Sequence, residues 1–99
     1  KGKVIGIGAV IQEKKGNLYL GPLTIGAPAW KSKQLSDGDR VLKVRSKPND
    51  EPVNVTGMLV DEAVRLIRGE KGTKVTLTVE KKDDKSIREV TMVREEVAI

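Results

Sequence analysis

One segment of this 99-residue chain has the apolar spacing of a long helix, and the other apolar runs are too short for one, which constrains the fold. From Met58 to Arg68, apolar residues fall at 59, 60, 63, 64, 66 and 67, and Gly69 stands where a left-handed C-cap is expected. The other apolar runs are short, rich in Val, Ile and Leu, and separated by turn residues. Because strands and helices do not alternate, we expect an α+β or small-barrel architecture rather than a parallel βαβ fold.

The short runs predict two hairpins and a central strand within a single domain spanning residues 1–99. The length suits one hydrophobic core and is too short for two. Turn chemistry and apolar patterning place the other elements as follows: an apolar run at 4–12 in which two glycines indicate a tight backbone feature that opens into a buried strand, a second strand at 18–23 that forms a hairpin with it around the turn 14–17, a short helix beginning at Pro28, a turn at 35–39, a strand at 40–44, a Pro-containing loop at 46–52, and a closing hairpin of strands 74–79 and 87–93.

The composition of the chain argues against most kinds of catalytic site. The chain has neither His nor Cys, so it offers no imidazole base, no Cys nucleophile and no metal site built on those ligands. The carboxylate pairs Asp37/Asp39 and Asp83/Asp84 lie in turn-like sequence and are expected to be solvated turn residues. We therefore predict no catalytic residues, no metal and no cofactor.

The basic balance of the chain does not by itself indicate a nucleic-acid partner. The net charge is +5, but the 19 Lys and Arg residues are interleaved with 14 acids, and only two aromatic residues could stack on bases. A solvated surface explains this distribution better than a basic stripe does. No apolar run approaches the length of a membrane span.

The predicted helix carries two neighbouring apolar stripes. At 100° per residue, Leu59, Ala63 and Leu66 share one sector, and a second sector beside it contains Val60, Val64 and Ile67. The first stripe would pack on the sheet, and the second could line a groove. A single broad stripe facing the core explains the same pattern, and periodicity alone favours it.

A glycine pair near the N-terminus offers a second candidate feature. In the run Gly6-Ile7-Gly8-Ala9, glycines flanking one residue would let successive backbone N–H groups point into one concavity, which suits a carboxylate. If the following strand has an open edge, an extended peptide could pair with it. A bulged or tightly bent strand start explains the glycines as well, and the motif alone favours that interpretation.

Five motifs in order resemble PDZ domains over nearly the whole chain. Two of them, Gly-Ile-Gly-Ala at the loop and Ala-Val-x-x-Ile-Arg-Gly-x-x-Gly-Thr at the helix end, are similar to the PDZ domain of bacterial carboxyl-terminal processing (tail-specific) proteases. The five motifs lie at residues 6–10, 26–29, 35–44, 61–69 and 71–77. The resemblance implies a small, partly open β-barrel or sandwich of five to six strands with one long and one short helix.

The resemblance also implies which residues hold a ligand. Backbone N–H groups of the loop Gly6, Ile7, Gly8 and Ala9 would bind the C-terminal carboxylate of a peptide, with Lys1 or Lys3 adding charge nearby. The groove would be lined by Val10, Ile11, Val60, Val64 and Ile67. Val60 would stand where many eukaryotic PDZ domains have a His that binds the residue two before the end, so an apolar tail is expected.

In the resembled family, the PDZ domain belongs to an exported serine protease with a Ser-Lys dyad, and it recruits or gates substrates by their C-termini. No dyad motif occurs here, so the resemblance implies a domain excised from a periplasmic or otherwise exported protease chain, membrane-associated only through that chain. Its implied partners are substrate C-termini and the protease domain of the same chain. The alternatives are a PDZ module of another exported protease or adaptor, and a basic structural or nucleic-acid-binding β-domain.

Overall fold

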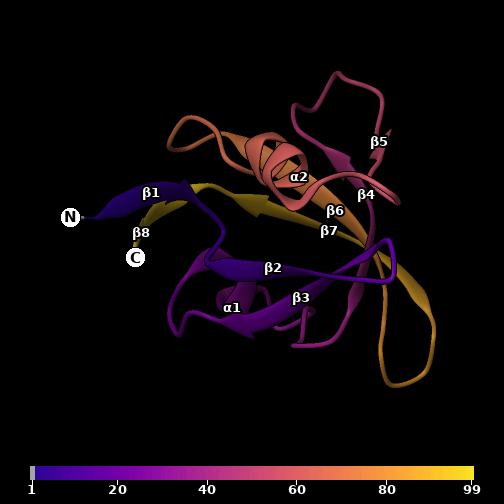
Figure 1. Ribbon diagram of the computed structural model, residues 1–99. Helices are drawn as coiled ribbons and strands as arrows, with labels where there is room; N and C mark the ends of the chain where they lie inside the picture. Colours follow the sequence, from indigo (N-terminus) through magenta and orange to yellow (C-terminus); the bar gives the residue numbers. More distant parts are fainter. Residues whose placement is uncertain (1) are drawn as a thin grey trace.

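Antiparallel pairing connects the strands of the computed structural model, which describes residues 2–99 (Figure 1). The main sheet has the order β2-β3-β4-β6-β7, with β5 paired to β4, and β1 and β8 form a separate two-stranded ribbon. The elements are β1 (Lys3–Gly6), β2 (Ala9–Lys14), β3 (Asn17–Leu23), α1 (Pro28–Ser32), β4 (Arg40–Arg45), β5 (Val53–Asn54), α2 (Val60–Ile67), β6 (Lys74–Glu80), β7 (Ile87–Val93) and β8 (Glu95–Ala98). The predicted α+β class is confirmed.

Both predicted hairpins are present. β2 and β3 meet at a tight turn in which Lys15 and Gly16 have φ values of 51° and 83°, the left-handed pair that hairpin turns favour. β6 and β7 pair in continuous register from Lys74↔Val93 to Glu80↔Ile87. Alternate residues of these strands, including Leu18, Leu20, Leu77 and Val90, are buried in one core with Ala63 of α2.

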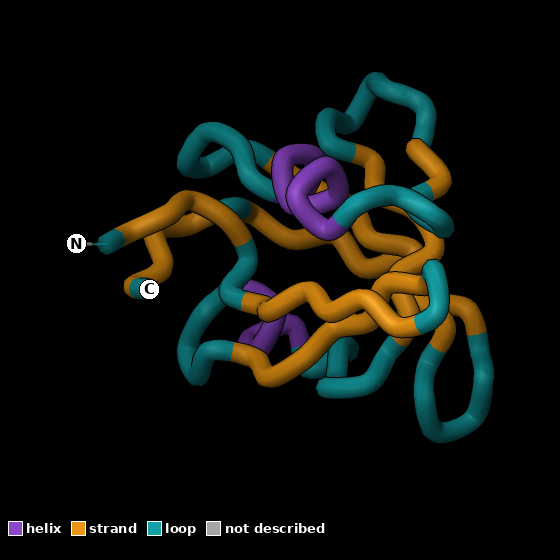
Figure 2. Tube along the Cα trace, viewed as in Figure 1, coloured by secondary structure: helices purple, strands orange, loops and turns teal. Residues whose placement is uncertain are grey.

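The ribbon of β1 and β8 was not predicted. The apolar run at residues 4–12 is interrupted at Ile7 and Gly8, where a tight backbone feature was expected, but its first part is itself a strand and pairs with β8 from Lys3↔Ala98 to Gly6↔Glu95. In Figure 2 the ribbon extends beyond the main sheet, on the side where the two ends of the chain lie. The short strand β5 was not predicted either; it lies directly after the loop expected at residues 46–52.

Asp39 is not the solvated turn residue that was expected. The other three, Asp37, Asp83 and Asp84, are exposed as expected. The Asp39 side chain is 1% exposed and accepts hydrogen bonds from the backbone N–H groups of Ser36 and Lys82 and from the ammonium group of Lys81. Asp39 therefore ties the turn before β4 to the end of β6. The long-range partners of Asp39 explain why local sequence did not show this role.

The end of α2 also differs from expectation, and the predicted left-handed C-cap at Gly69 is wrong. The helix ends at Ile67, and its cap residue Arg68 is extended, with φ −75° and ψ 159°. A side chain on Gly69 would place its Cβ 2.8 Å from the guanidinium carbon of Arg94. Gly69 is therefore explained by the close passage of the chain over Arg94, whose side chain takes the place of a capping turn.

Arg94 is the buried cation that binds the end of α2. It is 2% exposed, and its Nε donates to the carbonyl of Ile67 at 2.7 Å while Nη2 reaches the carbonyl of Leu66 at 3.2 Å. The remaining donors bind Ser46, Thr73 and the carbonyl of Lys74. None of the ion pairs found in residues 2–99 involves Arg94, and burial lowers the pKa of its guanidinium. Carbonyl dipoles at the helix C-terminus provide the compensating negative potential.

No helix in the described residues is both long and apolar enough to cross a membrane.

We predict that Arg94→Met lowers the free energy of unfolding by about 3 kcal/mol, because several buried carbonyls lose their donors at once. Urea unfolding followed by circular dichroism measures this change. Arg88→Met, at an exposed position on β7, is the matched control and should change stability by less than about 0.5 kcal/mol. Equal stability losses in the two variants would contradict the role assigned to Arg94.

Candidate functional site

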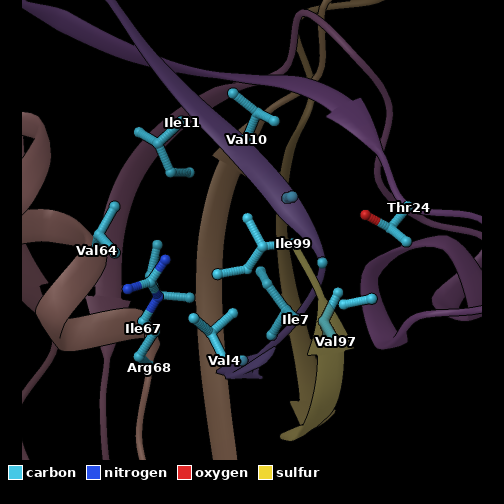
Figure 3. A pocket seen from close by; sticks show the side chains of 14 residues that line it. Val4, Ile7, Val10, Ile11, Thr24, Val64, Ile67, Arg68, Val97 and Ile99 are labelled. Atoms are coloured by element: carbon cyan, nitrogen blue, oxygen red, sulfur yellow. The ribbon is translucent and has the colours of Figure 1, made fainter. Parts of the chain in front are cut away.

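A cavity of about 420 Å³ lies between β2 and the C-terminal half of α2. Figure 3 shows its walls: the loop before β2, the start of β2, the end of α2, and the ribbon of β1 and β8. The lining is mostly apolar, with one charged residue. It consists of Val4, Gly6, Ile7, Gly8, Ala9, Val10, Ile11, Thr24, Val64, Ile67, Arg68, Val97, Ala98 and Ile99.

β2 borders this cavity with an unpaired edge. Among residues 2–99, β2 is the terminal strand of the main sheet and hydrogen-bonds only to β3. The residue before Ala9 accepts the Thr24 N–H, so the opposed pair Ala9↔Leu23 is of the non-hydrogen-bonded kind. The backbone N–H and C=O of Ala9 therefore point away from β3, towards the free edge. An extended chain can add there as a further strand.

Gly8 shapes the loop that opens into this edge. Its φ is +75°, and a Cβ at this position would stand 2.3 Å from the Cβ of Ala27. Gly6 is different: it lies in β1 without a positive φ, and an added Cβ would meet the Cγ of Arg68 at an ordinary 3.5 Å. The loop thus depends on one glycine, not on both as the sequence suggested.

The hydrogen bonds of the loop determine where its N–H groups point. The carbonyl of Ile7 accepts the N–H of Ala29 at 2.9 Å, and the carbonyl of Gly8 accepts the N–H of Thr24 at 2.8 Å. Because C=O and N–H point in opposite directions across a trans peptide, the N–H groups of Gly8 and Ala9 face away from α1 and β3. Within residues 2–99, the Gly8 N–H has no hydrogen-bond acceptor. Such donors are normally paired, so this one is available to a ligand.

The apolar walls are continuous with the core. Ile7 is 2% exposed and Ile67 is 5% exposed, and both belong to the buried cluster of the main sheet and α2. Val4 and Val97 enter from the ribbon, and the side chain of Ile99 lies between the strands and α2 in Figure 3. The cavity can therefore accept an aliphatic side chain against a hydrophobic floor.

The structure brings most of the predicted site residues together. Gly6, Ile7, Gly8, Ala9, Val10, Ile11, Val64 and Ile67 all line the cavity. Val60 does not: it lies in the first turn of α2 and packs partly against the core.

Lys3 does not provide the positive charge predicted near the ligand carboxylate. The ammonium of Lys3 lies 3.6 Å from a carboxylate oxygen of Glu96 and is not part of the cavity wall. Lys1 lies outside the described residues.

Sequence reasoning missed the cation that does line the cavity, Arg68. Its signal was present, because Arg68 stands four residues after Val64 and so falls on the same face of the helix. The contributions of Val4 and Val97 had no comparable signal, since they depend on the unpredicted ribbon. Among the described residues, no group of three or more carboxylate, His or Cys side chains is arranged to hold a metal ion.

Comparison with known protein families identifies the family of the chain. The PDZ domain family matches residues 1–80. The chain belongs to the PDZ domain family. The resemblance of its five sequence motifs to PDZ domains is thereby confirmed.

Relatives of this PDZ domain are named as tail-specific and carboxy-terminal processing proteases. It is 36% identical over 94 residues to a tail-specific protease of Haemophilus influenzae, a match covering 95% of this chain and 13% of that protein. It is 44% identical over 72 residues to a carboxy-terminal processing protease of Bacillus subtilis, covering 73% of this chain and 14% of that protein. The chain thus spans only a small part of these relatives.

Two solved structures share the fold of this domain. A PDZ domain of a carboxy-terminal protease from Vibrio cholerae, solved in complex with a peptide, superposes with a TM-score of 0.89 at 38% identity, covering 98% of this chain and 99% of that one. The photosystem II D1 C-terminal processing protease shares the fold, with a TM-score of 0.82 at 22% identity over 100% of this chain and 25% of that one.

We predict that Gly8→Ala destabilises this PDZ domain by at least about 2 kcal/mol, because the new methyl group overlaps Ala27 and strains a positive φ. Gly6→Ala, with room for the methyl group, should cost less than about 1 kcal/mol. Urea unfolding of the two variants makes the comparison. Similar losses of stability in the two variants would contradict the conclusion that the loop depends on Gly8 and not on Gly6.

Proposed function

We propose that this PDZ domain binds the free C-terminal end of an extended polypeptide with an apolar tail. The observation that carries the proposal is the unpaired N–H of Gly8, beside the outward N–H of Ala9, at the mouth of an apolar cavity. Two backbone donors suit a carboxylate, and the hydrophobic floor suits the last side chain. The free edge of β2 supplies hydrogen bonds for the residues before it.

The site favours a definite arrangement of the ligand. With the carboxylate at Gly8 and Ala9, the peptide runs antiparallel to β2, and its last side chain enters the space bordered by Ile7, Ile67 and Val97. The residue two before the end then lies beside Ile11, on the side where α2 presents Val60 and Val64 without a hydrogen-bonding group. An aliphatic or small residue fits both places. Affinity of about micromolar strength is typical of an interaction with one buried side chain.

The relatives extend the proposal to the parent protein. They are named as tail-specific and carboxy-terminal processing proteases, and the Vibrio cholerae domain is described in complex with a peptide. We propose that this domain likewise belongs to an exported serine protease with a Ser-Lys dyad, where it recruits or gates substrates by their C-termini. Its partners would then be substrate tails and the protease domain of the same chain.

The central test compares one peptide in two forms, with backbone amide NMR as the measurement. An eight-residue peptide ending in aliphatic residues is titrated as the free acid and as the C-terminal amide. For the acid we expect shifts at residues 7–11 and along α2, with saturation at about micromolar concentrations. The amide lacks the charge that the loop N–H groups bind and should bind at least about tenfold more weakly. Equal binding of both forms would rule out carboxylate recognition.

Arg68 gives a second prediction, since it is the cation on the cavity wall. Arg68→Gln should weaken binding of the free acid by roughly fivefold and leave binding of the amide nearly unchanged, because only the acid carries the complementary charge. Arg65→Gln removes the same charge from an exposed position of α2 that does not line the cavity. Isothermal titration at fixed ionic strength compares the two variants, and a larger loss for Arg65→Gln would contradict the assignment.

A further inference from the structure

We call the space between the free edge of β2 and α2 the groove; it begins at the cavity, where Arg68 is the nearby cation, and runs towards the turn between β2 and β3, where the nearby charges are acidic. We infer that the groove selects ligands with Lys or Arg at the fifth residue from the C-terminus, position −4 when the last residue is 0, through the carboxylates of Glu13 and Asp61. This inference rests on the proposed function and adds a charge preference to it.

The register of β2 places Glu13 opposite position −4. Ala9 points its backbone groups to the free edge, but the pairing of β2 with β3 shifts register between Ala9 and Ile11, so the direction at Ile11 is taken from its own partner. Leu20 pairs with Ile11 and exchanges hydrogen bonds with Gly38 and Asp39 on the side away from β2, so Ile11 also points its backbone groups to the free edge. The register is regular from Ile11 to Lys14, and Glu13 therefore points its groups the same way as Ile11. A ligand whose last residue lies at Ala9 therefore places residue −2 at Ile11 and residue −4 at Glu13.

The side chain of Glu13 shares the face of the strand that borders α2. Ala9 and Ile11 on this face pack partly against the core, and Glu13 is the next residue in the alternation. Its carboxylate accepts the N–H of Gly16 at 2.7 Å, which holds it at the exposed end of the strand. None of the ion pairs found in residues 2–99 neutralises it. A side chain at −4 would lie directly across from it, the position at which opposite charges attract.

α2 contributes the second carboxylate. Its C-terminal end lies at the ligand loop, where the Gly69 N–H reaches the Ile5 carbonyl, and its N-terminal side lies at the hairpin turn, where the Gly57 N–H donates to the Gly16 carbonyl at 2.8 Å. The helix therefore runs antiparallel to β2, and its first turn lies level with Glu13. Asp61 is exposed in that turn.

Helix geometry places Asp61 on the groove side. Seven residues separate Asp61 from Arg68, which corresponds to about 700° of rotation, so the two directions differ by only about 20°. Arg68 lines the cavity, and Asp61 follows the same face about 10 Å towards the other end. The groove rim thus has a cation near the ligand carboxylate and an acid near position −4.

The other charged side chains near this end do not cancel the two acids. Glu62 is turned farther from the groove, and its carboxylate accepts the Leu59 N–H at 3.2 Å. Arg65 lies about 40° beyond Asp61, away from Val64. Lys14 occupies the opposite face of β2, with its ammonium 5.8 Å from the centre of the Tyr19 ring, and Lys15 lies in the hairpin turn.

Fluorescence anisotropy with labelled peptides that differ only at −4 tests the inference. Three free-acid peptides with one aliphatic tail carry Lys, Ala or Glu at that position, and the Lys peptide is also made as the C-terminal amide. We expect Lys to bind roughly threefold more tightly than Ala, and Glu roughly threefold more weakly, at low salt. The differences should shrink as ionic strength rises to about 0.5 M, because exposed charges are screened.

Variants of the domain identify the residues responsible. Glu13→Gln keeps an oxygen for the Gly16 N–H, and the double variant with Asp61→Asn should bind the Lys and Ala peptides equally. Asp83→Asn removes the same charge from the exposed turn between β6 and β7 and should retain the threefold preference. Retention of the preference in the double variant would overturn the assignment to Glu13 and Asp61.

The peptide arms separate this inference from the function on which it rests. If the acids bind more tightly than the amide but position −4 has no effect, the charge preference is wrong and tail recognition stands. If none of the peptides binds, or if acid and amide bind alike, both proposals fail.

Discussion

The guanidinium of Arg94 joins the end of α2 to the loop after β4 and to β6, and the groove depends on that connection. One side chain satisfies the final carbonyls of the helix while also bonding to Ser46, Thr73 and Lys74. It binds the carbonyls of Leu66 and Ile67, and Ile67 lines the cavity next to Arg68. A buried cation with no carboxylate partner in the described part of the chain is tolerated because its donors meet oriented carbonyl and hydroxyl oxygens. A polar contact outside the groove thus helps to hold the end of α2, which forms one of its walls.

Local patterns predicted much of the fold. The helical periodicity placed α2 to within two residues at its start and one at its end, and the turn residues placed both hairpins. The family motifs gave the site loop and most of the cavity wall. These features share a cause: each is encoded by residues close in sequence, through periodicity, glycine or turn chemistry.

Long-range contacts account for what sequence reasoning missed. The pairing of β1 with β8 joins the two ends of the chain, and neither short run shows this partner in its own pattern. Asp39 looks like a turn residue until the end of β6 packs over it. Gly69 looks like a helix cap because that is the common reason for glycine after a helix, whereas the guanidinium of Arg94 is the reason here. Each case depends on a neighbour more than twenty positions away.

Ile7 and Ile67 belong both to the hydrophobic core and to the cavity wall. The cavity is therefore an unfilled part of the core, and a ligand side chain placed there would act as a core residue supplied by another molecule. Substitutions that reshape this wall must also preserve packing, which restricts how freely the preference for the last ligand residue can diverge among related domains. The exposed ends of β2 and α2 carry no such restriction. Related domains can therefore change their ligand preference more easily by exchanging charged residues at the exposed rim than by changing the residues that form the floor of the cavity.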